Sequence, residues 1–281
     1  MMKKIALITG ILTILIAIST FLFYRVNAEG KLDRQKYVQS TTPTLFFHGY
    51  GSSANAERHM TNAAKKTGVT KTVIRANVDR NGAVTLRGDI PKGAINPIVE
   101  VNYEDNRNPI DVGRYAKAVV SKLQEKYGFT KMNMVGHSLG NMSILYYLLE
   151  HAQDENLPQL QKQVNIANFV AGLEAMGLSS DVKVDKTTGQ PNQITQTFQR
   201  LLPLREVFPQ NQIDVLNIYG DYKNGSDGSV LNASSRSLKY LVADNAKSYQ
   251  EKKITGKLAQ HSQLHENQEV DKILIQFLWG K

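Results

Sequence analysis

Short apolar runs alternate with longer amphipathic stretches along most of the chain, and this alternation predicts strands and helices in turn. Runs rich in β-branched and aromatic residues predict buried strands, and apolar residues spaced three and four apart predict helices. The expected strands are residues 44–47, 73–79, 83–87, 97–102, 132–135, 166–170, 215–219 and 250–256. The expected helices are residues 54–66, 111–127, 139–150, 195–202, 229–242 and 270–279.

From the fourth expected strand onward, strands and helices alternate, which is typical of a mostly parallel sheet with helices on both faces. The runs on either side of Asn81-Gly82 add a β-hairpin with a two-residue turn. We expect one α/β domain over residues 43–281, after a polar tether at 29–42. Residues 175–212 are polar and irregular, and because so long a connection is usually functional or disordered, we expect a cap there. The apolar residues expected to cover an acyl pocket are Leu201, Leu202, Leu204, Val207 and Phe208.

The first 28 residues have the features of a targeting segment. Lys3 and Lys4 precede an apolar run at 5–23, and Val26-Asn27-Ala28 resembles a cleavage site. The run is also long enough to span a bilayer, so a cleaved signal peptide and a retained membrane anchor both stay open. In either case we expect the domain to be extracellular or on the cell surface.

Composition and charge narrow the chemistry. The chain has no cysteine, which excludes disulfides, thiolate metal sites and cysteine nucleophiles. The formal net charge is +9, and three positive charges precede residue 29, which leaves +6 on the remainder. This charge is compatible with association with a membrane or an anionic envelope, and equally with a solvated basic surface. We expect no nucleic-acid partner.

The strongest chemical signal is Gly136-His-Ser138-Leu-Gly140, which fits the nucleophile-elbow pattern G-x-S-x-G. An expected strand precedes it and an expected helix follows it. The sharp turn forces Ser138 into a strained backbone conformation, and the small residues Gly136 and Gly140 avoid clashes there. Ser138 is therefore the expected nucleophile, at a helix N-terminus that favours a developing negative charge.

A second glycine-rich turn, His48-Gly-Tyr50-Gly51, follows the first expected strand. Lipases and esterases use a loop at this place to aim a backbone N–H at the oxyanion. We expect the N–H groups of Tyr50 and Leu139 to form the oxyanion hole, each lowering the reaction barrier by about 3–4 kcal/mol. For His48 itself we expect a structural role rather than proton transfer.

The remaining parts of a triad should follow in the order serine, acid, histidine. Asp221 and Asp227 share the loop after the strand at 215–219, and the far end of the loop favours Asp227. His261 and His265 share the loop before the last helix, and His261, just beyond the last strand, is preferred over His265. His59, His137 and His151 are expected to be structural or surface residues.

Three segments resemble those of small secreted Gram-positive lipases. Val135–Tyr147 is similar to their elbow, and Ser226–Val230 and His261–Leu264 are similar to their acid and histidine segments. This resemblance supports Asp227 and His261. The hairpin and residues 175–212 depart from those lipases, which argues against a minimal open site.

Across residues 43–280 the chain more closely resembles a family of uncharacterised Gram-positive cell-surface α/β hydrolases, which are lipase- and esterase-like serine hydrolases. The resemblance is carried by three segments together, His48–Ser53, Gly136–Asn141 and Leu264–Asn267. It implies the α/β-hydrolase fold and leaves the substrate open.

These parts predict an exported serine hydrolase that forms an acyl-enzyme with a small or lipid-like ester. The reaction needs no metal and no organic cofactor. A thioesterase, an amidase or an acyltransferase would use the same residues. A non-catalytic cell-envelope binding protein on a hydrolase scaffold is the alternative of a different class.

Overall fold

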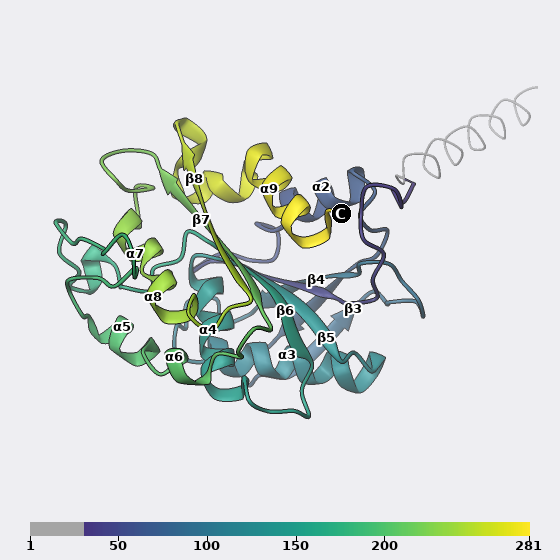
Figure 1. Cartoon of the computed structure of the whole chain (residues 1–281). Helices are drawn as coiled ribbons and strands as arrows, with labels where there is room; N and C mark the ends of the chain where they lie inside the picture. The colour runs from purple at the N-terminus through teal and green to yellow at the C-terminus, as the bar shows by residue number, and fades with distance from the viewer. Residues whose placement is uncertain (1–30) are drawn as a thin grey trace, which may run out of the picture.

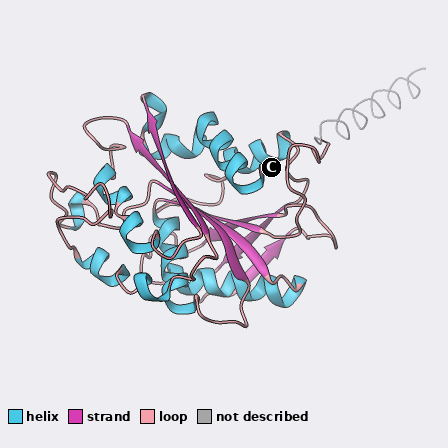
Figure 2. Cartoon of the chain, in the orientation of Figure 1, coloured by secondary structure: helices cyan, strands magenta, loops and turns pink. Residues whose placement is uncertain are grey.

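A twisted eight-stranded sheet forms the centre of the computed structural model, which describes residues 31–281 (Figures 1 and 2). The expected signal or anchor segment, residues 1–28, lies outside the described residues. The strand order is β3-β2-β4-β1-β5-β6-β7-β8, and every neighbouring pair is parallel except β2 and β3. The strands are β1 (Thr44–Phe47), β2 (Val73–Val78), β3 (Val84–Arg87), β4 (Ile98–Tyr103), β5 (Lys131–His137), β6 (Gln159–Ile166), β7 (Asp214–Asp221) and β8 (Ser248–Thr255).

Helices cover both faces of this sheet, which confirms the expected α/β-hydrolase architecture. Helices α2 and α9 lie on one face, and α3 to α8 lie on the other (Figure 1). The α-helices are α2 (Arg58–Lys66), α3 (Val112–Tyr127), α4 (Leu139–His151), α5 (Gln196–Leu201), α6 (Leu204–Val207), α7 (Asn232–Arg236), α8 (Leu238–Val242) and α9 (Gln268–Trp279). The 3₁₀ helices are η1 (Glu174–Met176), η2 (Lys257–Ala259) and η3 (His261–Glu266).

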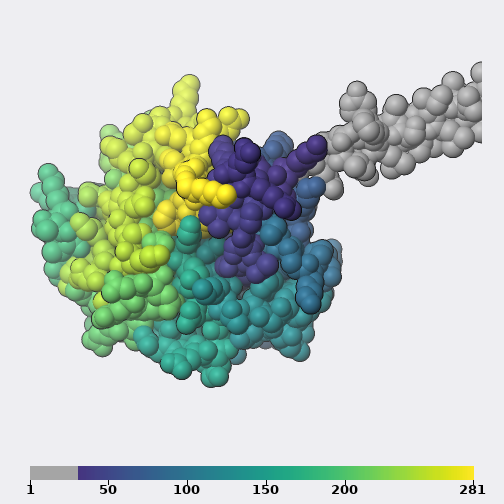
Figure 3. All heavy atoms as spheres, turned by 45° about the vertical axis from the view of Figure 1, so that its right-hand side comes forward, coloured from purple at the N-terminus to yellow at the C-terminus, as the bar shows by residue number. Residues whose placement is uncertain are grey.

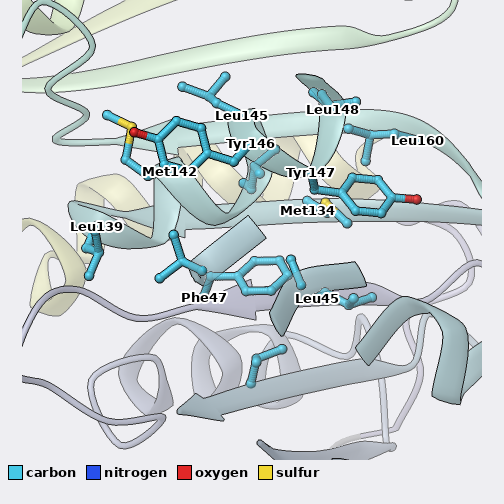
Figure 4. Close-up of a cluster of buried hydrophobic side chains, with 14 of the residues drawn as sticks. Leu45, Phe47, Met134, Leu139, Met142, Leu145, Tyr146, Tyr147, Leu148 and Leu160 are labelled. Carbon is cyan, nitrogen blue, oxygen red and sulfur yellow. The ribbon is translucent and has the colours of Figure 1, made fainter. Parts of the chain in front are cut away.

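Helix α4 is the central helix of the larger core. Every residue from Leu139 to Leu148 is buried, so the helix is in contact with the protein on all sides. Figure 4 shows its apolar side chains above Phe47 of β1 and Met134 of β5. This burial holds the N-terminus of α4 in place at the end of β5.

The β2–β3 hairpin is antiparallel as expected, but the expected two-residue turn is wrong. Val78 pairs with Val84, and residues 79–83 form the connection. The Asp79 carboxylate accepts hydrogen bonds from the backbone N–H groups of Asn81 (2.9 Å) and Ala83 (2.8 Å). Gly82 has φ 89°, whereas Asn81 is not left-handed. The two-residue type I′ turn needs positive φ at both central positions, so this sequence forms the longer connection.

The strand expected at residues 166–170 is also wrong, because β6 ends where that strand was expected to begin. Strand β6 has a polar sequence and therefore lacks the apolar pattern that predicts a buried strand. Its residues Gln163 and Asn165 are nevertheless fully buried, and they are hydrogen-bonded to each other at 2.7 Å. Ala167 then takes a positive φ of 50°, which turns the chain out of the sheet. Hydrogen bonding between amide side chains allows a polar strand to occupy a central position.

Residues 31–42 lie against the domain, although their composition predicts a tether. The Tyr37 side chain is 1% exposed, and its backbone forms a β-bridge with Gly280. The Val38 N–H donates to the Trp279 carbonyl at 2.8 Å. Figure 3 shows this segment, in purple, beside the yellow C-terminal residues. Both ends of the described chain therefore meet on one side of the domain.

Most of the apolar residues expected to cover an acyl pocket belong instead to the core. Leu201, Leu204 and Phe208 are buried in the same cluster as α4, against which α5 and α6 pack. The preceding loop, residues 179–193, is closed at its base by a hydrogen bond of 2.7 Å from the Ser179 N–H to the Gln193 side chain. A cap formed by this loop stays a prediction. Within residues 31–281, no helix is both long enough and apolar enough to cross a bilayer.

Candidate active site

Ser138 occupies the tight turn between β5 and α4. Its backbone has φ 52° and ψ −117°, a strained conformation for a residue with a side chain. A Cβ on Gly140 would lie 2.0 Å from the Phe47 carbonyl oxygen, and one on Gly136 would lie 2.7 Å from the Asn141 nitrogen. Both contacts are with backbone, so only glycine fits on either side of Ser138. The turn therefore presents the hydroxyl at the carboxyl edge of the sheet.

A continuous line of hydrogen bonds joins Ser138, His261 and Asp227. The Nε2 atom of His261 lies 3.0 Å from the Ser138 Oγ, and its Nδ1 atom lies 2.8 Å from the Asp227 carboxylate. The backbone N–H of His261 also donates to the backbone carbonyl of Asp227 at 2.9 Å, which fixes the loop that carries His261 to the loop that carries Asp227. Asp227 is 1% exposed, whereas the imidazole is partly open to solvent.

The loop around Asp227 orients this carboxylate. Its second oxygen accepts hydrogen bonds from the N–H groups of Ser229 (2.8 Å) and Val230 (2.7 Å). Asp221, the alternative acid, instead accepts from the Gly225 N–H at 3.2 Å and pairs with Lys253 at 3.2 Å. The structure thus brings Asp227, and not Asp221, to the imidazole.

The loop after β1 lies directly against the serine. A Cβ on Gly49 would lie 3.2 Å from the Ser138 Cβ. Among residues 31–281 the Tyr50 N–H has no acceptor, and the Leu139 N–H is in the first turn of α4, where no intrahelical acceptor exists. Both expected oxyanion donors therefore lie on segments adjacent to Ser138. The Tyr50 side chain is 60% exposed.

His48 has a structural environment. Its Nε2 atom accepts from the Tyr103 N–H at 3.1 Å, so the proton is on Nδ1, which donates to the Gly49 carbonyl at 2.9 Å. Burial lowers the pKa of His48, and the Gly49 carbonyl only partly opposes that effect. The neutral ring ties the end of β4 to the loop that carries Tyr50.

His137 and His265 form a second layer of imidazoles behind His261. The His137 Nε2 atom donates to the His261 carbonyl at 3.0 Å, and its ring meets the His265 ring edge-on at 4.7 Å between centroids. Burial, followed by repulsion from His261 and His265, holds the pKa of His137 well below its usual range. His137 is therefore a neutral donor that positions the backbone of His261. His265 faces Glu266, with Nδ1 3.1 Å from its carboxylate.

Asn141 is a supporting residue that the sequence analysis included in a resemblance segment but gave no role. It is fully buried, and its amide nitrogen donates to the carbonyls of Ser138 (2.9 Å) and Ile166 (2.8 Å). Asn165 of β6 donates in turn to the Asn141 oxygen at 3.0 Å. The elbow is thus tied to the neighbouring strand through side chains. The signals available for it in the sequence were its place one residue after the elbow glycine and its presence in the resemblance segment Gly136–Asn141.

Glu57 is a buried carboxyl group at the start of α2. It is 0% exposed, and neither carboxyl oxygen has a hydrogen-bond partner within residues 31–281. Burial, followed by repulsion from Glu100 and Glu266, raises the pKa of Glu57 well above its ordinary value. The buried surroundings of Glu57 therefore favour its protonated form over the carboxylate.

Replacing Glu57 with glutamine should remove a pH-dependent loss of stability. The folded state binds the proton more tightly than the unfolded chain, so this residue's contribution is complete below the unfolded pKa of about 4.3 and is lost as pH rises through the raised folded pKa. The loss is about 1.4 kcal/mol for every tenfold difference in proton affinity between folded and unfolded states. Urea unfolding at pH 5 and pH 8 should therefore show a smaller decline in the free energy of unfolding for Glu57→Gln than for the wild type.

The matched control is Glu155→Gln, because Glu155 is exposed. It should reproduce the wild-type decline. A Glu57→Gln protein that is less stable than the wild type at both pH values would mean that the carboxyl group makes a stabilising contact.

Comparisons with known proteins agree with this fold. Residues 31–281 match the family model described as "Alpha/beta hydrolase of unknown function (DUF915)". The product of the gene lin2722 from Listeria innocua is 27% identical, with a TM-score of 0.78 over 85% of this chain and 94% of that one. A protein from Lactobacillus plantarum WCFS1, described as a "putative cell surface hydrolase", is 20% identical, with a TM-score of 0.67 over 84% of this chain and 89% of that one. No curated protein matches the sequence.

The similarity to the Lactobacillus plantarum protein shows only a shared fold, whereas the family model matches the whole described chain. The resemblance read from the sequence motifs is thereby confirmed. The chain belongs to this DUF915 family of alpha/beta hydrolases.

Proposed function

We propose that the protein is a serine hydrolase of carboxylic esters, with Ser138 as nucleophile, His261 as general base and Asp227 as the residue that orients the imidazole. The observation that carries the proposal is the line of hydrogen bonds of 2.8 Å and 3.0 Å that ends at a strained serine. A serine hydroxyl is a weak nucleophile unless a positioned base accepts its proton. A purely structural turn requires neither the base nor the carboxylate behind it.

The reaction follows from these positions. His261 accepts the Ser138 proton as the oxygen attacks the ester carbonyl, and the N–H groups of Tyr50 and Leu139 stabilise the oxyanion. The protonated imidazole then donates its proton to the leaving alcohol, which leaves an acyl-enzyme. Water, deprotonated by the same imidazole, releases the acid and restores the serine.

Thioesterase, amidase and acyltransferase activities would use the same groups, and the fold does not choose between them. The choice of an ester rests on the resemblance of the elbow, acid and histidine segments to those of small secreted lipases. A binding protein on an inherited scaffold is the contrasting class. It would need none of the three aligned side chains.

We also propose that the domain acts outside the cell. The lysines and apolar run of residues 3–23 support export, as a cleaved signal or as an anchor. The Lactobacillus plantarum neighbour described as a "putative cell surface hydrolase" is consistent with this location.

A fluorophosphonate probe and a panel of p-nitrophenyl esters of graded chain length test the enzymatic proposal together. We expect stoichiometric labelling of the wild type and turnover of at least one ester. A folded protein that neither reacts with the probe nor hydrolyses any member of the panel would favour the binding class.

Asp227→Asn should lower kcat by about 10⁴-fold, the cost of the analogous change in a serine protease, because the amide no longer holds the productive imidazole tautomer. Asp221→Asn is the matched control at the end of β7, just before the loop that carries Asp227, and it should cost less than tenfold. Steady-state rates with one p-nitrophenyl ester measure both. The opposite ranking would make Asp221 the acid of the triad.

A further inference from the structure

The loop after β1 presents the N–H group of Tyr50 through a tight turn of four residues. The Ser52 N–H donates to the Gly49 carbonyl at 3.3 Å, and Gly51, the third residue of the turn, has φ 65°. A positive φ at the third position and not at the second is the pattern of a type II turn. Of the N–H groups of Tyr50, Gly51 and Ser52, only that of Tyr50 has no acceptor among residues 31–281. The turn therefore leaves free the one N–H group that the proposed reaction uses.

Asn106, in the loop after β4, holds this turn through two hydrogen bonds. Its backbone carbonyl accepts the Gly51 N–H at 2.7 Å, and its side-chain amide nitrogen donates to the Ser52 carbonyl at 2.7 Å. The contact is possible because β1 and β4 are parallel neighbours, so the loops that follow them leave the same edge of the sheet side by side. One residue of the β4 loop thus binds two consecutive residues of the turn.

The bond to Gly51 fixes the peptide group between Tyr50 and Gly51. Type I and type II turns differ by a rotation of this central peptide group, which exchanges the directions of its carbonyl and its N–H. Because Asn106 holds the Gly51 N–H, the turn stays in the type II form. At the other end of the turn, a Cβ on Gly49 would lie 3.2 Å from the Ser138 Cβ. The place of the Tyr50 N–H is therefore set by Ser138 on one side and by Asn106 on the other.

Asn108 is an asparagine in the same loop with a different set of partners. Its amide nitrogen donates to the carboxylates of Asp105 (3.1 Å) and Asp111 (2.8 Å). Its side-chain oxygen accepts from the N–H groups of Ile110 (2.9 Å) and Asp111 (3.2 Å). All of these bonds stay inside the loop after β4. Asn108 therefore stabilises that loop without a hydrogen bond to the turn after β1.

We propose that Asn106 is a positioning residue that holds the Tyr50 N–H where it stabilises the oxyanion, an inference that rests on the ester hydrolysis proposed above. The oxyanion forms only as the reaction proceeds, so a displaced donor raises the barrier without weakening the binding of the substrate. A displacement of about 1 Å costs on the order of 10²-fold in rate. Asn106 acts on the reaction through Tyr50.

Asn106→Ala removes the side-chain bond to Ser52 and should lower kcat for a short p-nitrophenyl ester at least tenfold, with a change in KM of less than about threefold. Asn108→Ala is the matched control, because it breaks more hydrogen bonds in the same loop. Its kcat should stay within about threefold of the wild-type value. Asn106→Asp keeps the size of the side chain and should lose at least as much as Asn106→Ala, because a carboxylate oxygen would face the Ser52 carbonyl oxygen.

An alkyl trifluoromethyl ketone tests the oxyanion hole directly. The Ser138 oxygen adds to the ketone carbon, the serine proton passes to His261, and the former ketone oxygen carries the negative charge. The inhibition constant of this ketone should rise in Asn106→Ala by the same factor by which kcat/KM falls. An asparagine that only stabilises the fold would lower the melting temperature and leave the inhibition constant unchanged. Wild-type kcat and inhibition constant in both Asn106 variants overturn the proposal.

Hydrogen–deuterium exchange separates failure of this inference from failure of the enzymatic proposal, because it needs no turnover. Exchange of the Gly51 and Ser52 amides, followed by mass spectrometry of peptides that cover the turn, should be at least about tenfold faster in Asn106→Ala and unchanged in Asn108→Ala. Faster exchange in a protein that hydrolyses no ester supports the hold of Asn106 on the turn and contradicts the enzymatic proposal. Unchanged exchange in both variants of a protein that does hydrolyse esters overturns the role of Asn106 and leaves the triad in place.

Discussion

Ser138→Ala is expected to lower kcat for short p-nitrophenyl esters by on the order of 10⁶-fold, as removal of the nucleophile does in a serine protease. The hydroxyl has one side-chain partner, the His261 Nε2 atom at 3.0 Å, so its removal leaves the rest of the hydrogen-bond line intact. The alanine can adopt the same φ of 52° at a similar cost. The variant should therefore keep the wild-type melting temperature while losing both turnover and reaction with a fluorophosphonate.

The purified variant is the decisive sample, because traces of host esterases give false residual rates. Mass spectrometry of the labelled wild type should place the probe on the peptide that contains Ser138. Full activity in a pure Ser138→Ala protein, or labelling of a different serine, would contradict the assignment of the nucleophile.

His261→Ala should be nearly as damaging as Ser138→Ala, because in a serine protease the loss of the histidine alone costs about as much as the loss of the serine. His265→Ala should cost less than tenfold. His265 lies in the same 3₁₀ helix, but its Nδ1 atom faces Glu266 and its ring packs on His137. It can affect the reaction only through the position of that second ring.

The two histidine variants control for each other, since both remove an imidazole from η3. Rates of probe labelling measured at one pH distinguish them without a choice of substrate. A His265→Ala protein that does not react with the probe, beside a His261→Ala protein that does, would reverse the assignment.

The fold was predictable where the local sequence signals agreed. The Gly-x-Ser-x-Gly turn, the apolar strand before it and the helix after it predicted the place of Ser138, and the alternation of strands and helices predicted a mostly parallel sheet. Strand β6 was not predictable from hydropathy, because Gln163 and Asn165 are buried by hydrogen bonds to other amides and not by apolar contacts. Cross-strand partners of this kind do not appear in a periodic pattern.

The candidate site also combines residues that the sequence predicted with residues that only the tertiary contacts reveal. Chain order and loop position favoured Asp227 over Asp221 and His261 over His265, but His265 stayed a close alternative because it is only four residues away in the same loop. Glu57 follows Ala54-Asn-Ala56 in what looks like a surface segment, and only the packing of α2 against η3 makes its burial evident. The cross-strand pairing of Arg75 with Arg87 depends on the register of β2 against β3, which the expected two-residue turn would have set differently.

The two ends of the described chain lie at the edge of the sheet opposite to Ser138. Tyr37 bridges Gly280, and Lys162 of β6, which pairs with the first residue of β7, donates to the Phe277 and Leu278 carbonyls at 2.8 Å and 2.9 Å. Both ends of the described chain are therefore at the amino edge of the parallel sheet, whereas Ser138 is at the carboxyl edge. If the chain ahead of residue 31 is attached to a surface, the amino edge of the sheet faces that surface. Ser138 then lies on the opposite side of the domain and faces the medium.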